Sequence, residues 1–454
     1  MKKYVLFLMI AFFCVLQGCD NMDVETKGIP EFNAAVAKYP GLLNNRHITG
    51  KRLDGWKDDC SDGVHWENLV IHNLTLEDVE MWRAHLKNVT FVDCKFIKVD
   101  FSRSIFDNVK FIRGKIYGYS KPDDPGKEYE SVFRNISITR VLFDGTEFGQ
   151  SVDTNFGSGI VVMRNIKADL PPKKNYWLLR GTNLQVRLDN CQISNQAAVS
   201  NLGEKNTLYA TNSKFINAEL SLDGPAAWIE NCEMTNSYAP STNILVIKNN
   251  RLSGIGVGAR TDNVGKKDEG QRVFLVNNTY IKPPSQNDSP LDTTTNLSLL
   301  MARNNTRPDK ANLYIYSSPN IPGRVVVDSG NIHIYDTEID FLSMRQSRSN
   351  CSLANLDLQN VKIRGGGDWE YADIRHGKWE NVEIYPPVDI GKGKFGEIIG
   401  HRVEFPQGTP WKNGELKITP SYEPLTFDKP PVPTLEETGL AQFWKENDFP
   451  KENY

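Results

Sequence analysis

The 454-residue chain lacks most of the short motifs that identify common enzyme classes. It has no GxSxG nucleophile turn, no HExxH zinc helix and no Walker phosphate loop. It has no CxxC pair, and its seven cysteines are too scattered to suggest a disulfide framework. It also lacks a block of lysine and arginine, and its formal net charge is −3. These absences argue against motif-defined catalysis and against nucleic acid as a partner.

The N-terminus has the three parts of an export signal. A basic head at 2–3 is followed by 13 apolar residues at 4–16, and the sequence LQGC then ends at Cys19. The apolar run is shorter than the roughly 20 residues of a membrane-spanning helix. A buried N-terminal helix is the alternative interpretation. No later segment is apolar enough to cross a membrane.

LQGC resembles the lipobox of bacterial lipoproteins, in which the cysteine becomes the lipidated first residue of the mature chain. The resemblance implies a signal peptide over 1–18, acyl chains such as palmitate on Cys19, and a place in the cell envelope facing the periplasm. Asp20 implies retention at the inner membrane. Acyl anchors act by burying methylenes, each of which contributes about 0.8 kcal/mol.

Phenylalanine occupies every fifth position from Phe91 to Phe111. Neither a helix, with its period of 3.6, nor a strand, with its period of 2, can place all of them on one face. The same spacing of large apolar residues extends from Trp66 to Ile116, with a small or apolar residue two positions before most of them. The pattern resembles the pentapeptide-repeat family, a right-handed coil in which each five-residue step makes one of four sides.

A hexamer with a central asparagine recurs along the chain. WENLVI, LKNVTF and FDNVKF place Asn68, Asn88 and Asn108 at intervals of 20 residues, which predicts a stack with about 4.8 Å between neighbours. Stacked asparagines can hydrogen-bond to one another, and they tolerate left-handed backbone. Looser copies, one predicted for each later turn, are centred on Asn135, Asn165, Asn190, Asn212, Asn231, Asn249, Asn277, Asn304, Asp336, Asn360, Asn381 and Arg402.

We therefore predict an all-β protein. It is a right-handed parallel β-helix that begins as a regular four-sided, pentapeptide-like coil and continues as wider, looped turns. The predicted division is a signal peptide at 1–18, a lipid tether and N-terminal cap at 19–60, the regular coil at 61–120, irregular turns at 121–408, and a C-terminal cap and tail at 409–454. Helical apolar spacing predicts a capping helix within 30–43. A capping box formed by Thr434 and Glu437 predicts a second helix from about Thr434.

Two pairs of residues could form a disulfide or a metal site. Cys191 and Cys232 hold the same hexamer position, which indicates packed core residues, with a disulfide as the alternative. His65 and His85 are 20 residues apart, so the coil predicts them stacked on one outward face. No third ligand is apparent, because Ile105 follows in that column. We predict no metal and no cofactor.

The stretch 364–387 gathers aromatic and basic residues around one predicted turn. Trp369, Tyr371, Arg375 and His376 form our candidate binding patch, of the kind that anchors interfaces or stacks on sugars. A glycine-rich turn whose aromatic residues cover the edge of the coil is the alternative.

The sequence favours an exported, membrane-anchored lipoprotein that is not an enzyme and that binds a protein or a glycan with the surface of its coil. Neutralising a toxin is one such role, by analogy with membrane-tethered immunity factors. The alternative is a polysaccharide lyase or glycoside hydrolase with a dispersed acidic site. That alternative is favoured if three carboxylates and a basic residue converge in one groove on adjacent turns. A structural spacer is the third interpretation.

Overall fold

The computed structural model describes residues 28–50, 53, 63–118, 133–149, 152, 154–169, 177–195, 197–201, 205–259, 271–281, 295–301, 311–327, 329–344 and 351–450. The expected signal peptide, Cys19, Asp20 and the hexamer copy at Asn304 lie outside these residues.

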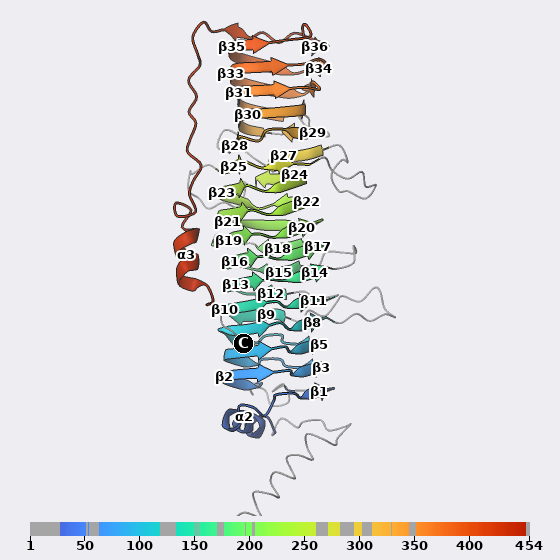
Figure 1. The fold of residues 1–454 in the computed structure, drawn as a ribbon, viewed down its shortest axis with the longest axis vertical. Helices are drawn as coiled ribbons and strands as arrows, with labels where there is room; N and C mark the ends of the chain where they lie inside the picture. Colours follow the sequence, from blue (N-terminus) through green and yellow to red (C-terminus); the bar gives the residue numbers. More distant parts are fainter. Residues whose placement is uncertain are drawn as a thin grey trace, which may run out of the picture.

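The chain forms one parallel β-solenoid, a rod of stacked turns that runs from β1 (His47–Thr49) at one end to β37 (Thr419–Pro420) at the other (Figure 1). Each described strand pairs in parallel with strands one turn away. Strands of the C-terminal turns are longer, up to 15 residues, than those of the first turns. The predicted all-β class and right-handed parallel β-helix are confirmed.

The strands fall into three groups along the rod. The N-terminal turns contain β1 (His47–Thr49), β2 (His65–His72), β3 (Thr75–Glu80), β4 (His85–Val92), β5 (Lys95–Asp100), β6 (Ile105–Asp107), β7 (Val109–Ile112) and β8 (Lys115–Tyr117). The middle turns contain β9 (Phe133–Ile138), β10 (Arg140–Asp144), β11 (Glu147–Phe148), β12 (Thr154–Phe156), β13 (Gly159–Arg164), β14 (Lys167–Asp169), β15 (Trp177–Gly181), β16 (Leu184–Asp189), β17 (Gln192–Ser194), β18 (Ala197–Asn201), β19 (Thr207–Thr211), β20 (Lys214–Ile216), β21 (Glu219–Glu230), β22 (Glu233–Ala239), β23 (Ser241–Lys248) and β24 (Arg251–Ala259). The C-terminal turns contain β25 (Arg272–Val276), β26 (Thr279–Tyr280), β27 (Thr295–Met301), β28 (Asn312–Tyr316), β29 (Ile321–Val327), β30 (Ser329–Ser343), β31 (Cys351–Ile363), β32 (Gly367–Asp368), β33 (Ala372–Ile384), β34 (Val388–Asp389), β35 (Lys394–Glu404), β36 (Trp411–Lys412) and β37 (Thr419–Pro420).

The corners between strands use left-handed backbone. From Asn68 to Arg113 every fifth residue has a positive φ, between 52° and 61°. Such values are uncommon for residues other than glycine, although asparagine and aspartate tolerate them best. The Asn88 side-chain amide donates to the Asn68 carbonyl oxygen at 2.9 Å, and Asn108 donates to Asn88 at 2.8 Å. The predicted asparagine stack is therefore confirmed.

The later hexamer copies also form left-handed corners, but not in the column of Asn68. From Asn165 onward they stack on the neighbouring corner column, which starts with Asn73 and Asp93. The hexamer does not determine which column of corners it joins, because every corner needs only a residue that tolerates positive φ. The corner between Asn277 and Asp336 is Ser317, with φ 51°, and not the predicted Asn304.

The interior is filled by the aromatic residues of the fivefold pattern. The Phe91 and Phe111 rings stack with 5.2 Å between centroids, and the Phe111 and Phe143 rings stack at 5.0 Å. All three side chains are essentially inaccessible to solvent. Successive turns therefore hold one another through face-to-face ring contact as well as through backbone hydrogen bonds.

The buried cysteines are packing residues. The Ser213 hydroxyl accepts from the Cys191 backbone N–H, and Ser213 in turn donates its N–H to the Cys232 sulfur, so one turn separates the two thiols. Both cysteines are free, and burial raises the pKa of each thiol to about 12. The packing interpretation is confirmed, and a disulfide between them is wrong.

The two histidines of the regular coil stack as predicted. His65 and His85 are register partners, and their ring centroids are 5.3 Å apart in an edge-to-face arrangement. Ile105 follows them in the same column. Across the part of the chain that the structure describes, no three His, Cys, Asp or Glu side chains are grouped to hold a metal ion.

A helix, α2 (Gly28–Lys38), covers the N-terminal end of the rod. It includes most of the helical spacing expected within 30–43. Phe32 packs against Trp66 at 6.3 Å, and the Asn33 side chain accepts the His65 backbone N–H at 3.0 Å. The helix thereby covers apolar side chains and a backbone donor that the first turn would otherwise expose.

Replacing Phe111 by alanine should cost about 3–5 kcal/mol of unfolding free energy, because it removes a ring that stacks on both neighbouring turns. The measurement is denaturant unfolding followed by circular dichroism. Ile105→Ala is the control, because its side chain is 47% exposed and should change stability by less than about 0.5 kcal/mol. Equal losses in the two variants would contradict the role assigned to the stack.

Candidate functional site

The outer face of the C-terminal turns carries three columns of side chains that run along the rod. β25, β28, β30, β31, β33 and β35 pair in register, so residues two apart on each strand align with those of the next. The first column, here the amide column, contains Arg272, Asn312, Asn331, Asn355, His376 and Glu397. The second, the ring column, contains Phe274, Tyr314, His333, Asp357 and Lys378. The third, the strap column, contains Val276, Tyr316, Tyr335, Gln359, Glu380 and His401.

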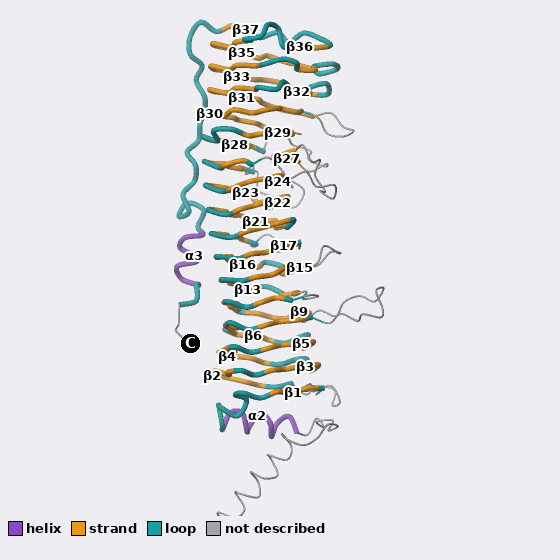
Figure 2. The backbone as a smooth tube through the Cα atoms, turned by 45° about the vertical axis from the view of Figure 1, so that its right-hand side comes forward, coloured by secondary structure: helices purple, strands orange, loops and turns teal. Residues whose placement is uncertain are grey.

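A C-terminal strap, residues 421–449, descends over this face from β37 to a short helix, α3 (Leu440–Asn447) (Figures 1 and 2). The Leu425 backbone N–H donates to Glu380 at 2.9 Å, and the Tyr316 hydroxyl donates to the Pro430 carbonyl at 2.8 Å. The Lys429 ammonium lies 4.5 Å from the centre of the Tyr335 ring. The strap thus covers the strap column and leaves the amide column beside it.

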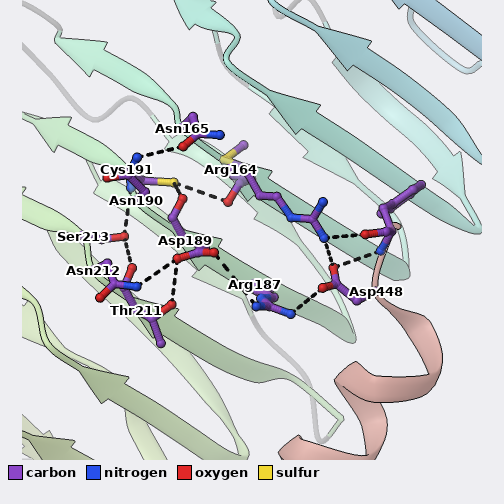
Figure 3. Close-up of polar contacts among 12 residues, drawn as sticks. Arg164, Asn165, Arg187, Asp189, Asn190, Cys191, Thr211, Asn212, Ser213 and Asp448 are labelled. Carbon is purple, nitrogen blue, oxygen red and sulfur yellow. Dashed lines mark hydrogen bonds and ion pairs between the residues drawn. The ribbon is translucent and has the colours of Figure 1, made fainter. Parts of the chain in front are cut away.

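The lower end of the strap is held by an ion-pair network (Figure 3). Arg164 and Arg187 each donate to one carboxylate oxygen of Asp448 at 2.5 Å. The Arg164 side chain is only 6% exposed, so its charge depends on this partner. Leu440 and Trp444 are buried in the same apolar cluster as Val162 on the outer face. Charge pairing and apolar burial together fix α3 to the rod.

The predicted capping box forms, but it does not begin the helix. Thr434 and Glu437 exchange two hydrogen bonds, from each backbone N–H to the other side chain, at 2.7 and 3.2 Å. The helix itself starts at Leu440, because Gly439 adopts a left-handed conformation with φ 76° and interrupts the turn that precedes it. The box closes that preceding turn.

A groove runs along the amide column beside the strap. Its C-terminal part is a cleft of about 490 Å³ floored by the amide and ring columns and flanked by Asp428 of the strap. A second hollow of about 420 Å³ continues it past Arg272 and Ile244 to Ala226, and is bordered by Thr438 of the strap. Asn312 lines both hollows, so they adjoin along one column of residues, and we call the two together the groove. With seven steps of about 4.8 Å from Ala226 to Glu397, it is roughly 34 Å long.

The centre of the cleft contains a stacked pair of rings and an oriented histidine. The His333 and Tyr314 rings are nearly parallel, with 4.7 Å between centroids. His333 Nδ1 lies 3.0 Å from the Asp357 carboxylate, and the other carboxylate oxygen accepts the Lys378 backbone N–H at 3.0 Å. Burial, and then the negative charge of Asp428, raise the pKa of the Tyr314 hydroxyl. Tyr314 therefore stays neutral. Its ring is stacked between Phe274 and His333, so it can offer a ligand its ring edge and its hydroxyl.

Amide groups line the adjoining wall. The Asn355 side chain donates to the Asn331 carbonyl oxygen at 2.9 Å, which orients both amides along the column. Asn331 is 6% exposed and His333 is 9% exposed, so both are set by the fold and are not free surface groups. Preset donors and acceptors beside a ring face are the usual elements of a site for a polar ligand.

The residues predicted as the binding patch do not come together. Trp369 is fully buried; its indole N–H donates to the Leu342 carbonyl at 3.0 Å, and its ring packs on Trp379 at 6.1 Å. Its assignment to an exposed patch was wrong, because the chain turns its side chain into the core directly after β32. Tyr371 is half-buried and Arg375 is exposed, and neither lines the cleft. His376 does line it.

Sequence reasoning missed the cleft residues, although a signal for them exists. Two cleft residues precede each left-handed corner, one by five positions and one by three. Asn331 and His333 precede Asp336 in this way, and His376 and Lys378 precede Asn381. Aligning the hexamers and extending the comparison upstream would have placed these pairs in neighbouring columns. The glutamate of the next turn, Glu397, has the same offset from Arg402.

The fold defines the chain as a parallel β-helix protein with an axial groove on one outer face. No protein-family model matches the sequence, and a comparison with curated proteins gives no match. Two solved structures show a similarity in fold, an alginate lyase AlyF-OU02 in complex with G6 and a PL6 alginate lyase in complex with a trisaccharide. They are 11% and 10% identical, with TM-scores of 0.25 and 0.24, over 80% of this chain and 87% of each of theirs. A similarity this low carries no argument about activity.

A search of the described residues for a helix long and apolar enough to cross a membrane finds none.

Replacing Asp448 by alanine should release the lower strap, because it leaves the buried Arg164 and its neighbour Arg187 without their shared partner. We expect amide hydrogen exchange in α3 to accelerate at least about tenfold, while exchange in the solenoid strands stays unchanged. Glu446→Ala is the control, because Glu446 lies on the exposed side of the same helix. Unchanged exchange in Asp448→Ala would show that apolar packing alone holds α3.

Proposed function

We propose that this protein binds a linear glycan in the groove along the amide column. The observation that carries the proposal is the Tyr314–His333 ring stack, which lies beside a wall of oriented amides in an open cleft. Sugars present an apolar ring face and a polar hydroxyl edge. The edges of the stacked rings can contact the apolar face, and the amides can hydrogen-bond to the hydroxyl groups. The contacts that a glycan needs are thus present within adjacent turns of one face.

The shape of the groove also supports a linear ligand. It runs parallel to the rod axis over roughly 34 Å and repeats at the turn spacing of about 4.8 Å. A repeating polymer can therefore meet similar chemical groups at successive turns. A protein partner would instead need a broad interface of roughly 800 Å² per side with a buried apolar centre. The strap already covers the aromatic strap column on this face.

A second candidate function is cleavage of the bound glycan. Three carboxylates, Asp357, Glu397 and Asp428, line the same cleft as Lys378. This meets only part of the condition set out for a dispersed acidic site, because Asp357 and Glu397 lie two turns apart and Asp428 belongs to the strap. His333, oriented by Asp357, is positioned as a general base would be. Binding without cleavage remains our leading proposal, and reducing ends released from a bound polymer would favour the enzyme.

Tyr314→Ala should weaken glycan binding about tenfold, because it removes the ring and the hydroxyl group that line the cleft. The measurement is isothermal titration of the full mature chain, with Cys19→Ser to keep it free of lipid. The probes are hexasaccharides of glucosamine, N-acetylglucosamine, glucose and a uronic acid, and reducing ends are assayed in parallel.

Tyr422→Ala is the matched control, because Tyr422 is 92% exposed and does not line the cleft. If no hexasaccharide binds the parent chain, or if the two tyrosine variants lose affinity equally, the groove is not the glycan site. If the parent chain and Tyr314→Ala then capture the same protein from envelope extracts equally well, a protein ligand such as a toxin is favoured.

We also propose that the chain is exported and held at a membrane by lipid on Cys19. The basic head, the short apolar run and LQGC support this, and Asp20 favours the inner membrane. A lipid tether would leave the β-helix outside the bilayer, facing the periplasm, where its groove meets envelope polymers. We further propose that residues 61–120 form a regular four-sided coil like that of pentapeptide-repeat proteins, because large apolar residues recur there at every fifth position.

Cys19→Ser should move the protein from the detergent phase to the aqueous phase in a detergent partition assay, because the acyl chains are lost. Mass spectrometry of the mature N-terminal peptide should show acyl chains on Cys19 in the parent only. Cys60→Ser serves as the control. Identical partition of the parent and Cys19→Ser would contradict the anchor.

A further inference from the structure

The cleft contains more negative than positive charge. Its lining includes the carboxylates of Asp357, Glu397 and Asp428 and a single ammonium group, that of Lys378. His333 and His376 are the other titratable groups at this end besides Tyr314. With neutral histidines the cleft carries a net charge of about −2 at neutral pH. Arg272 lies beyond Asn312 at the other end of the groove.

The charges differ in how far the protein itself satisfies them. Asp357 contacts His333 and the Lys378 backbone N–H, and the Lys378 ammonium donates to the Thr426 carbonyl at 2.9 Å. Within the part of the chain that the structure describes, Glu397 and Asp428 have no hydrogen-bond or ion-pair partner. The two carboxylates come from different elements, β35 and the strap, and border one cleft.

A second group is also available to a ligand in the same cleft. His333 is 9% exposed, and its Nδ1 is taken by Asp357. Its Nε2 has no partner among the described residues, although the ring lines the cleft and is fixed by Tyr314. This imidazole nitrogen is therefore open to a ligand or to water in the cleft. This independent feature points to a polar ligand at the same place as the two carboxylates.

From this arrangement we infer that the groove selects glycans that carry amino groups, with those groups next to Glu397 and Asp428. The inference rests on the proposed glycan-binding function and names the class of sugar. Charged amino groups would satisfy both carboxylates, whereas a polymer of uronic acids would bring like charges to the same end. Repulsion between like charges is a strong source of specificity, so the discrimination should exceed that from shape alone.

The test is isothermal titration of the full mature chain, with Cys19→Ser, at about pH 7, the neutral pH at which the cleft is net negative. The probes are glucosamine hexamer, N-acetylglucosamine hexamer and a uronic acid hexamer of equal length. We expect the glucosamine hexamer to bind tightest and the uronic acid hexamer weakest. The preference should shrink as the salt concentration rises, because salt screens the attraction.

Glu397→Gln combined with Asp428→Asn should weaken binding of the glucosamine hexamer about tenfold. It should leave binding of the N-acetylated hexamer, which carries no charge, within about twofold. Glu404→Gln is the matched control, because Glu404 is an exposed glutamate of the same strand outside the cleft. Circular dichroism checks that each variant keeps its fold.

Two results would overturn the inference while leaving glycan binding intact. One is a uronic acid hexamer that binds as tightly as the glucosamine hexamer. The other is a double variant, Glu397→Gln with Asp428→Asn, that still prefers the glucosamine hexamer to the uronic acid hexamer, while Tyr314→Ala binds both more weakly than the parent chain does. Failure of every hexamer to bind, with no effect of Tyr314→Ala, overturns the proposed function and this inference together.

Discussion

Left-handed corners hold the strands of this protein in register. A residue such as Asn88 must adopt a φ of 52° for the chain to turn out of one strand and into the next. The energetic penalty is low for asparagine, and the side chain then hydrogen-bonds to the asparagine of the adjacent turn. Because each corner repeats directly above the last, the strands between corners pair without slipping. Ring stacks such as that of Phe91 and Phe111 fill the interior that this register creates.

The same register produces the outer columns. A side chain at a fixed offset before a corner lies above the side chain at that offset one turn earlier, so chemical groups far apart in sequence become neighbours. Tyr314, His333 and Asp357 come together in this way although 43 positions separate the first from the last. The varying number of residues between strands leaves this alignment unchanged, because each strand pairs in register with the strand one turn away.

The C-terminal strap divides the outer face into a covered part and an open part. It buries the aromatic residues of the strap column and is fastened at its end by Asp448 between two arginines. Its other edge contributes Asp428 to the groove. Stability and ligand recognition therefore share one segment. A solenoid with such a strap can expose a polar groove without exposing the apolar column next to it.

The sequence by itself determined the β-helix, the asparagine stack, the paired histidines and the packing of Cys191 and Cys232, because these follow from local spacing. It did not determine which way the side chain of Trp369 points, nor that Ser317 forms a corner, because both depend on which strands pair. The groove depends on the same pairing and on a strap from the far end of the chain. Only the tertiary structure decides such long-range contacts, since loop lengths between turns vary and leave no fixed period to read.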